Sequence, residues 1–160
     1  MNNVTLSPRT ALVVDNNELT LEVLQYALED AGFETTTATS GCLAIRMLAK
    51  QWFDVLVVDV NLAHINGLAL GQQARERYGD RIAILVMSDQ DIERWGVTSL
   101  QVCADDFLVK PFNLDEFIAR VESKVRRLPT AKRGQQHVPS LQRRRPRATR
   151  WQPTPRLPQP

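Results

Sequence analysis

The chain has 160 residues, of which 43% are hydrophobic and 24% charged, and this suits one ordinary globular domain. Its charge is unevenly divided. Residues 1–127 hold 12 basic and all 18 acidic residues, a net charge of −6, whereas residues 128–160 hold eight basic residues, seven of the nine prolines and no acid. We therefore expect an N-terminal extension at 1–9, a folded acidic domain at 10–127 and a disordered basic tail at 128–160.

The composition excludes several classes of protein. No apolar run approaches the ~20 residues that span a bilayer, and the first ten residues, MNNVTLSPRT, lack the basic and apolar regions of a secretory signal. Cys42 and Cys103 stand in no CxxC or Cys/His cluster, which argues against structural zinc. We expect a cytoplasmic protein with reduced cysteines and no membrane contact.

In the first half of the domain, short apolar runs alternate with segments of helical period. Strands are predicted at 11–14 and at 33–37. A helix is predicted from about Asn17 to Gly32, and a second one after Ser40. Their apolar residues are Leu21, Leu24 and Leu28, with Val23 and Ala27 beside them, in the first helix, and Leu43, Ala44, Met47 and Leu48 in the second.

The second half continues the alternation. Runs at 54–59 and 82–87 are apolar without a polar face, as in strands that helices cover on both sides. A polar helix is predicted at about 67–78, a weaker one at 91–103 and a short strand at 107–109. Asn113 is expected to cap a last helix, whose apolar side contains Leu114, Phe117, Ile118, Val121 and Val125.

Five β-α units predict an α/β fold, a parallel sheet with helices on both faces. Such sheets bind ligands beyond the carboxyl ends of their strands. Asp15, Asp59, Ser88 and Lys110 each end or follow a strand run, so we expect them to converge. Carboxylates suit Mg²⁺, and one can accept a phosphoryl group. A lysine and a hydroxyl can then offset the charge on the phosphoryl oxygens.

The segments ALVVDNNE, DVLVVDVNLAHINGLAL, AILVMSD and ADDFLVKPF occur in this order and closely resemble the receiver domain of bacterial two-component response regulators. The resemblance covers roughly residues 10–127. It implies a flavodoxin-like receiver fold with a five-stranded parallel sheet of order 2-1-3-4-5 and five helices. The partner it implies is a sensor histidine kinase or phosphotransfer protein.

The resemblance also implies roles for single residues. Asp59 corresponds to the phosphoacceptor, Lys110 to the lysine before a cis-proline, Ser88 to the switch hydroxyl and Phe107 to the aromatic switch residue. Mg²⁺ would be held by ligands from Asp15, Asn16, Asp59 and the backbone carbonyl of Asn61. Gly67 corresponds to the glycine that opens the third helix. Phosphorylation would act through the face of helix 4, strand 5 and helix 5, where a homodimer is also possible.

Three residues depart from the family pattern. Asn16 stands where the family has a second acid, so we expect weaker Mg²⁺ binding. Asp89 replaces a small residue after the switch hydroxyl. Its carboxylate could repel an incoming phosphoryl group, pair with Lys110 or restore the missing acid. Cys103 replaces a glycine that ends the fourth helix, where a left-handed conformation would cost stability.

Two functions follow from these observations. The first is a receiver that a kinase phosphorylates on Asp59 and that turns over no external substrate, so it is not an enzyme. The second is an atypical receiver that works as a dimerisation or protein-interaction module without phosphorylation. A phosphatase of the haloacid-dehalogenase type needs an aspartate where Asn61 stands, and we set it aside.

The basic tail has two interpretations. Its arginines, with Trp151 nearby, could bind nucleic acid by charge and stacking. Its abundant Arg and Pro also resemble an out-of-frame translation that replaces a lost output domain. We favour a tail without a specific function.

Overall fold

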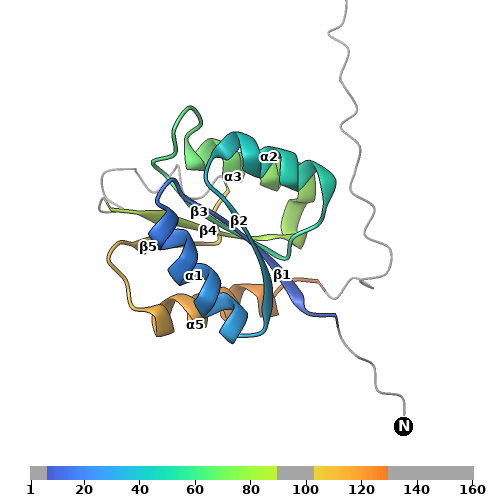
Figure 1. Ribbon diagram of the computed structural model, residues 1–160. Coiled ribbons are helices and arrows are strands. Elements are labelled where there is room, and N and C mark those ends of the chain that lie inside the picture. The colour runs from blue at the N-terminus through green and yellow to red at the C-terminus, as the bar shows by residue number, and fades with distance from the viewer. Residues whose placement is uncertain (1–6, 90–102, 130–160) are drawn as a thin grey trace, which may run out of the picture.

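The computed structural model describes residues 7–89 and 103–129 (Figure 1). Five parallel strands form one sheet in the order β2-β1-β3-β4-β5, which confirms the predicted topology. The strands are β1 (Arg9–Val14), β2 (Phe33–Ala38), β3 (Val55–Asp59), β4 (Ala83–Ser88) and β5 (Asp106–Val109). Each predicted strand is present, with bounds that differ by one or two residues.

The helices of the described residues are α1 (Glu18–Asp30), α2 (Gly41–Lys50), α3 (Gly67–Tyr78) and α5 (Leu114–Arg126), with a 3-10 turn η1 (Gly79–Arg81) after α3. The weaker helix predicted at 91–103 lies outside the described residues, Cys103 excepted. The predicted starts at Asn17, Ser40 and Asn113 are confirmed, because each side chain accepts a hydrogen bond from a backbone N–H of the first turn. At the end of α1, Gly32 has a φ of +88°, which glycine adopts without strain.

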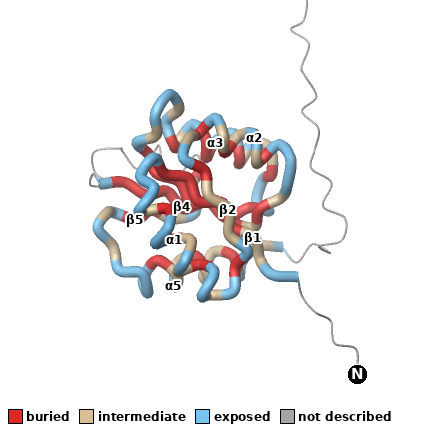
Figure 2. Tube along the Cα trace, viewed as in Figure 1, coloured by how far each residue is buried: buried red, intermediate tan, exposed pale blue. Residues whose placement is uncertain are grey.

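The sheet separates two apolar layers (Figure 2). Residues Leu12, Leu56 and Ile84 face α2 and α3, whereas their neighbours along the strands, such as Val13 and Val57, face α1 and α5. This alternation follows from the two-residue period of a strand. All five residues of β3 are buried, so the absence of a polar face in its sequence is explained by helices on both sides.

The predicted apolar faces of the helices need two corrections. In α1, Leu21, Leu24 and Leu28 are buried as expected, but Val23 is 40% exposed. In α5, Phe117, Val121 and Val125 are buried as expected, but Leu114 is 38% exposed. Leu114 is the first residue of α5 and precedes the first buried residue of the helix, Phe117. Among the described residues, no helix is long and apolar enough to cross a membrane.

Candidate functional site

Four polar residues lie at the carboxyl edge of the sheet. Asp15 follows β1, Asp59 ends β3, Ser88 ends β4 and Lys110 follows β5. Asp15, Asp59 and Ser88 are buried. Parallel strands end at the same edge, so residues that are up to 95 positions apart in the chain meet there.

Lys110 joins the two carboxylates. Its Nζ lies 2.7 Å from Asp15 Oδ2 and 3.3 Å from Asp59 Oδ2. Asp15 is only 1% exposed and Asp59 6%, and a buried charge without a partner is costly. The lysine therefore offsets part of the cost of placing two carboxylates side by side, and the predicted convergence of these three residues is confirmed.

Backbone groups fix both carboxylates. The Asn17 N–H donates to Asp15 Oδ1 at 2.8 Å, and the Asn61 N–H donates to Asp59 Oδ1 at 3.3 Å. Gly67 lies so close to the end of β3 that an added Cβ would stand 1.9 Å from the backbone oxygen of Asp59. Only glycine allows α3 to begin at this distance from the strand, which explains the glycine in physical terms.

The electrostatics of the site shift two pKa values. Burial raises the pKa of Asp59, and Asp15 raises it further, while Lys110 and the Asn61 N–H lower it without cancelling the effect. Burial lowers the pKa of Lys110, but its hydrogen bond and charge interaction with Asp15, together with Asp59, outweigh burial and leave that pKa raised. The lysine is thus held as a cation beside the acids.

The oxygen atoms at this edge fit Mg²⁺. Mg²⁺ takes oxygen ligands, commonly one or two carboxylates, and keeps several waters. Asp15 and Asp59 supply the carboxylates, and the exposed Asn16 between Asp15 and α1 can add an amide oxygen. Among residues 7–89 and 103–129, no three His, Cys, Asp or Glu side chains gather closely enough to hold a metal ion. The donor set therefore has two acids.

Asp89 pairs with an unexpected residue. The Asn61 side chain donates from Nδ2 to Asp89 Oδ1 at 3.0 Å. Lys110 contacts Asp15 and Asp59 instead, so the hypothesis that Asp89 pairs with Lys110 is wrong. In the described parts of the chain no three acids gather, and Asp89 is joined to Asn61 rather than to Asp15 or Asp59. Sequence reasoning used only the backbone carbonyl of Asn61 and missed its side chain.

Ser88 and Phe107 lie on the two neighbouring strands β4 and β5. The Lys110 N–H donates to the Ser88 carbonyl at 2.7 Å, which holds the residue before Pro111 against β4. The Lys110–Pro111 peptide bond is cis, as the resemblance implies. Phe107 pairs with Val86 of β4 and is 8% exposed, within the apolar layer under α2 and α3.

Cys103 is a packing residue in this structure. It is 4% exposed, its Sγ lies 3.6 Å from the Leu68 carbonyl, and Gly71 of α3 leaves room for it. Arg75 is a neighbouring cation that sequence reasoning did not foresee, but burial dominates and raises the pKa of the thiol. A buried thiol of raised pKa is a poor nucleophile.

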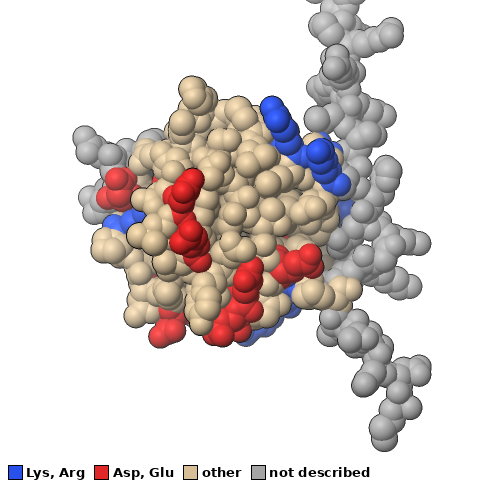
Figure 3. Space-filling model, viewed as in Figure 1, with Lys and Arg blue, Asp and Glu red and all other residues tan. Residues whose placement is uncertain are grey.

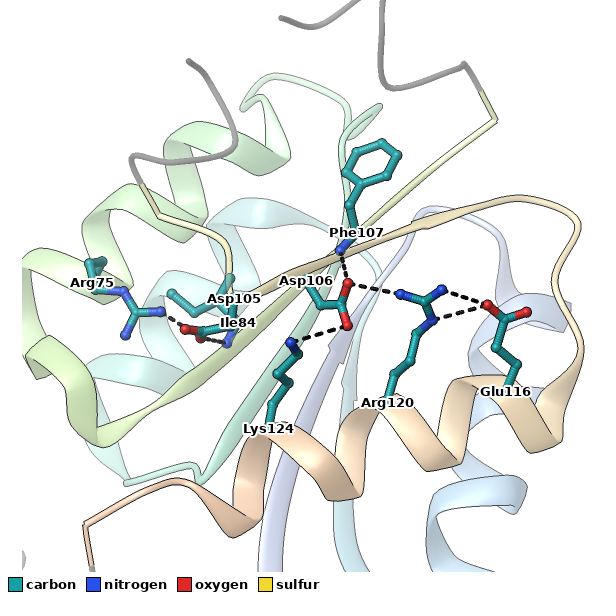
Figure 4. A network of polar contacts seen from close by, with 8 residues as sticks. All are labelled: Arg75, Ile84, Asp105, Asp106, Phe107, Glu116, Arg120 and Lys124. Carbon is teal, nitrogen blue, oxygen red and sulfur yellow. Dashed lines mark hydrogen bonds and ion pairs between the residues drawn. The ribbon is translucent and has the colours of Figure 1, made fainter. Parts of the chain in front are cut away.

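A polar network at the start of β5 was also missed by sequence reasoning (Figure 4). Asp105 accepts from the Ile84 N–H at 2.7 Å and from Arg75 at 2.6 Å. Asp106 accepts from Arg120 at 3.0 Å and lies 3.5 Å from Lys124, so it ties β5 to α5. The only signal in the sequence is the Asp105-Asp106 pair before a strand, which does not identify its partners.

Comparison with known proteins agrees with the geometry. The sequence model of the response regulator receiver domain matches residues 11–122. The chain is 36% identical over 116 residues to the response regulator MprA of Mycobacterium leprae, a match that covers 72% of this chain and 50% of MprA. The chain belongs to the response regulator receiver family, and it spans about half the length of the curated relatives it matches.

Solved structures support the same assignment. A CheY-like receiver domain from Methanospirillum hungatei has a TM-score of 0.71 at 21% identity and covers 75% of this chain and 95% of its own, which shows the fold. The response regulator TrrA of Thermotoga maritima, solved in complex with Mg²⁺-BeF, has a TM-score of 0.66 at 28% identity over 72% of this chain and 98% of TrrA. Receiver domains are signalling modules of two-component systems and generally bind Mg²⁺ at an acidic pocket.

Proposed function

We propose that a partner histidine kinase or phosphotransfer protein phosphorylates this receiver on Asp59, with Mg²⁺ bound nearby. The observation that carries the proposal is the Lys110 ion pair with both Asp15 and Asp59 at the carboxyl edge of the sheet. A carboxylate can act as the nucleophile toward phosphorus, and the lysine offsets charge on the phosphoryl oxygens. Asp15, Asn16, Asp59 and the carbonyl of Asn61 would hold the ion, which neutralises charge on the phosphoryl group when bound.

The proposed signal passes along β4 and β5. We assign Ser88 as the hydroxyl that turns toward the phosphoryl group and Phe107 as the ring that moves with it. Ser88 ends β4, and Phe107 pairs with Val86 of the same strand. A population shift needs a group that contacts the phosphoryl oxygens differently in the two states, and we assign this role to Ser88 and Lys110. The output face is then α5, β5 and the segment before them, where homodimerisation remains a prediction.

The partner surface that we propose is α1. This helix has four acids, Glu18, Glu22, Glu29 and Asp30, and no basic residue, and acidic side chains gather over it in the space-filling view (Figure 3). Leu19 is 69% exposed and Tyr26 73%. Exposed apolar groups with a charged rim are typical of protein interfaces. Because α1 begins next to Asp15, a partner on it would stand beside the acidic site.

The test is the intact mass of the full chain after incubation with acetyl phosphate and Mg²⁺, beside Asp59→Asn. We expect one added phosphoryl group in the wild type and none in the variant. Labelling of both proteins would mean that the phosphoacceptor is a residue other than Asp59. No labelling of either protein by acetyl phosphate or by phosphoramidate, with another receiver labelled in parallel, would contradict the proposal.

The alternative function is a receiver that binds partners without phosphorylation. Asn16 stands in place of an acid and disfavours binding of the metal. The carboxylate of Asp89 beside the site disfavours the entry of a phosphoryl anion. On this alternative, Mg²⁺ would not bind at millimolar concentration. The receiver at 10–127, the extension at 1–9 and the tail at 128–160 remain proposed boundaries under either function. Leu128 packs against the apolar layer of α1 and α5, and the tail from residue 130 onward, with its proposed nucleic-acid binding, lies outside the described residues.

A further inference from the structure

An exposed carboxylate, that of Asp89, stands beside the acidic site. Asp89 directly follows β4, and Asn61 lies two residues beyond Asp59. Both are exposed, and Asn61 Nδ2 donates to Asp89 Oδ1 at 3.0 Å. The bond joins the loop after β3 to the loop after β4. It therefore holds the Asp89 carboxylate near the site, where a free loop residue would turn away into solvent.

Among the described residues of the site, none balances the charge of Asp89 by an ion pair. Lys110, the lysine at this edge, is engaged by Asp15 at 2.7 Å and by Asp59 at 3.3 Å. Within residues 7–89 and 103–129, no lysine or arginine forms an ion pair with Asp89. The Asp89 carboxylate thus adds a negative charge at the surface beside the two buried acids.

The burial of Asp59 and the exposure of Asp89 show on which side of the phosphoryl group the Asp89 carboxylate would lie. Asp59 is 6% exposed, whereas Asp89 and Asn61 are on the surface. Phosphoryl transfer places the attacking and leaving atoms in line on opposite sides of phosphorus. If the attacking oxygen is the buried one, the leaving group departs on the solvent side, which is the side of Asp89.

We propose that Asp89, positioned by Asn61, is a specificity-determining residue that selects phosphodonors by the charge of their leaving group. It disfavours donors that release an anion, such as acyl phosphates, relative to donors whose leaving nitrogen carries protons, the class that includes phosphoramidate and a protonated phosphohistidine. This inference rests on the proposed phosphorylation of Asp59.

The two reactions differ in the charge that leaves. With phosphoramidate, an Asp59 oxygen forms the new bond to phosphorus, the P–N bond breaks, and its electron pair stays with the protonated nitrogen, which departs as neutral ammonia. With acetyl phosphate, the P–O bond breaks and acetate departs with its electron pair and a negative charge. Asp89 repels acetate and its developing charge. It attracts the protonated nitrogen.

The experiment measures the rate of Asp59 phosphorylation of the full chain by intact mass, with each donor at the same Mg²⁺ concentration. Asp89→Asn keeps an acceptor for the Asn61 amide and removes the charge. We expect it to raise the acetyl phosphate rate on the order of threefold or more, as one unit charge at close range would, and to leave the phosphoramidate rate unchanged or lower. The ratio of the phosphoramidate rate to the acetyl phosphate rate is therefore expected to fall.

Asp80→Asn is the matched control. Asp80 lies in η1, before β4 and thus at the opposite end of that strand, so the variant changes the net charge equally and should leave the ratio unchanged. If the wild type is labelled but the ratio is unaltered in Asp89→Asn, or changes equally in both variants, the proposed role of Asp89 is overturned. The proposed phosphorylation of Asp59 is not affected by either result. If neither donor labels Asp59 in any variant, both this proposal and the proposed phosphoacceptor fall.

Discussion

At the scale of single residues, the approach of Gly67 to Asp59 is the tightest constraint on the site. A Cβ at position 67 would meet the Asp59 backbone oxygen at 1.9 Å and its carbonyl carbon at 2.7 Å. Because backbone atoms cannot turn aside as a side chain can, we expect Gly67→Ala to cost about 3 kcal/mol of unfolding free energy. It should also slow phosphorylation, since the displaced strand end carries Asp59.

Gly41→Ala serves as the control for this prediction. Its Cβ would meet only the Ile65 side chain, at 3.1 Å, and alanine favours a helix more than glycine does. Urea unfolding of both variants measures the difference. Equal stability losses in the two variants would contradict the close approach of α3 to β3.

Asn16 gives a second prediction at this scale. A carboxylate there would add a third negative ligand beside Asp15 and Asp59, and affinity for a hard cation rises with the charge of its ligands. We expect Asn16→Asp to tighten Mg²⁺ binding about tenfold, which corresponds to roughly 1.4 kcal/mol. Calorimetric titration measures it. Asn17→Asp adds the same charge at the helix cap and should change the affinity much less.

At the scale of elements, Asp105 links three parts of the fold. It accepts from the Ile84 N–H at 2.7 Å and from Arg75 of α3 at 2.6 Å, and Arg75 also donates to the carbonyls of Cys103 and Ile82. Removal of the carboxylate leaves the N–H and the guanidinium without this acceptor. We expect Asp105→Ala to cost about 1–3 kcal/mol.

Asp105→Asn separates the hydrogen bonds from the charge. Its amide oxygen can still accept from Ile84, so thermal unfolding should place this variant between the wild type and Asp105→Ala. If Asp105→Asn loses as much stability as Asp105→Ala, the stabilisation comes from the ion pair with Arg75 and not from the hydrogen bond with the Ile84 N–H.

The exposed apolar residues of α1 carry the prediction on partners. Tyr26 is 73% exposed and Leu19 69%, so Tyr26→Ser should leave stability within ~0.5 kcal/mol of the wild type. We expect it to reduce phosphotransfer from the cognate kinase at least tenfold, as loss of an aromatic interface residue often does, while labelling by acetyl phosphate is unchanged. Val109→Ser, a change at an exposed residue of β5 (39%), is the control. Equal transfer to all three proteins would exclude α1 as the docking surface.

At the scale of the whole molecule, the sequence predicts the fold well because its signals are local and repeated. Uninterrupted apolar runs identify β3 and β4, and the caps Asn17, Ser40 and Asn113 define where helices begin. The parallel topology then brings Asp15, Asp59 and Lys110 together without further information. The contacts of Asp89 and Asp105 could not be predicted, because each depends on the relative position of two loops or of a loop and a strand, which no local pattern encodes.

The balance of charge in the site determines how stability varies with pH. The folded-state pKa of Asp59 is raised above its ordinary value of 3.8, chiefly by burial. A group with a raised folded pKa contributes its stability below the unfolded pKa, and this contribution is lost as the pH rises through the folded value. Ionised Asp59 therefore destabilises the fold at neutral pH.

We accordingly expect Asp59→Asn to unfold at a higher temperature than the wild type at pH 7 in the presence of a chelator. Lys110 keeps Asp15 as its partner at 2.7 Å, so the substitution leaves no cation unpaired. Near pH 3.8 the gain should shrink, because the wild-type side chain is then largely protonated in the folded state. Calorimetry of both proteins across this range checks the sign: a gain that stays constant with pH would mean that the substitution acts through packing, whereas a loss at pH 7 would mean that the attraction of Lys110 exceeds the cost of burying the Asp59 charge.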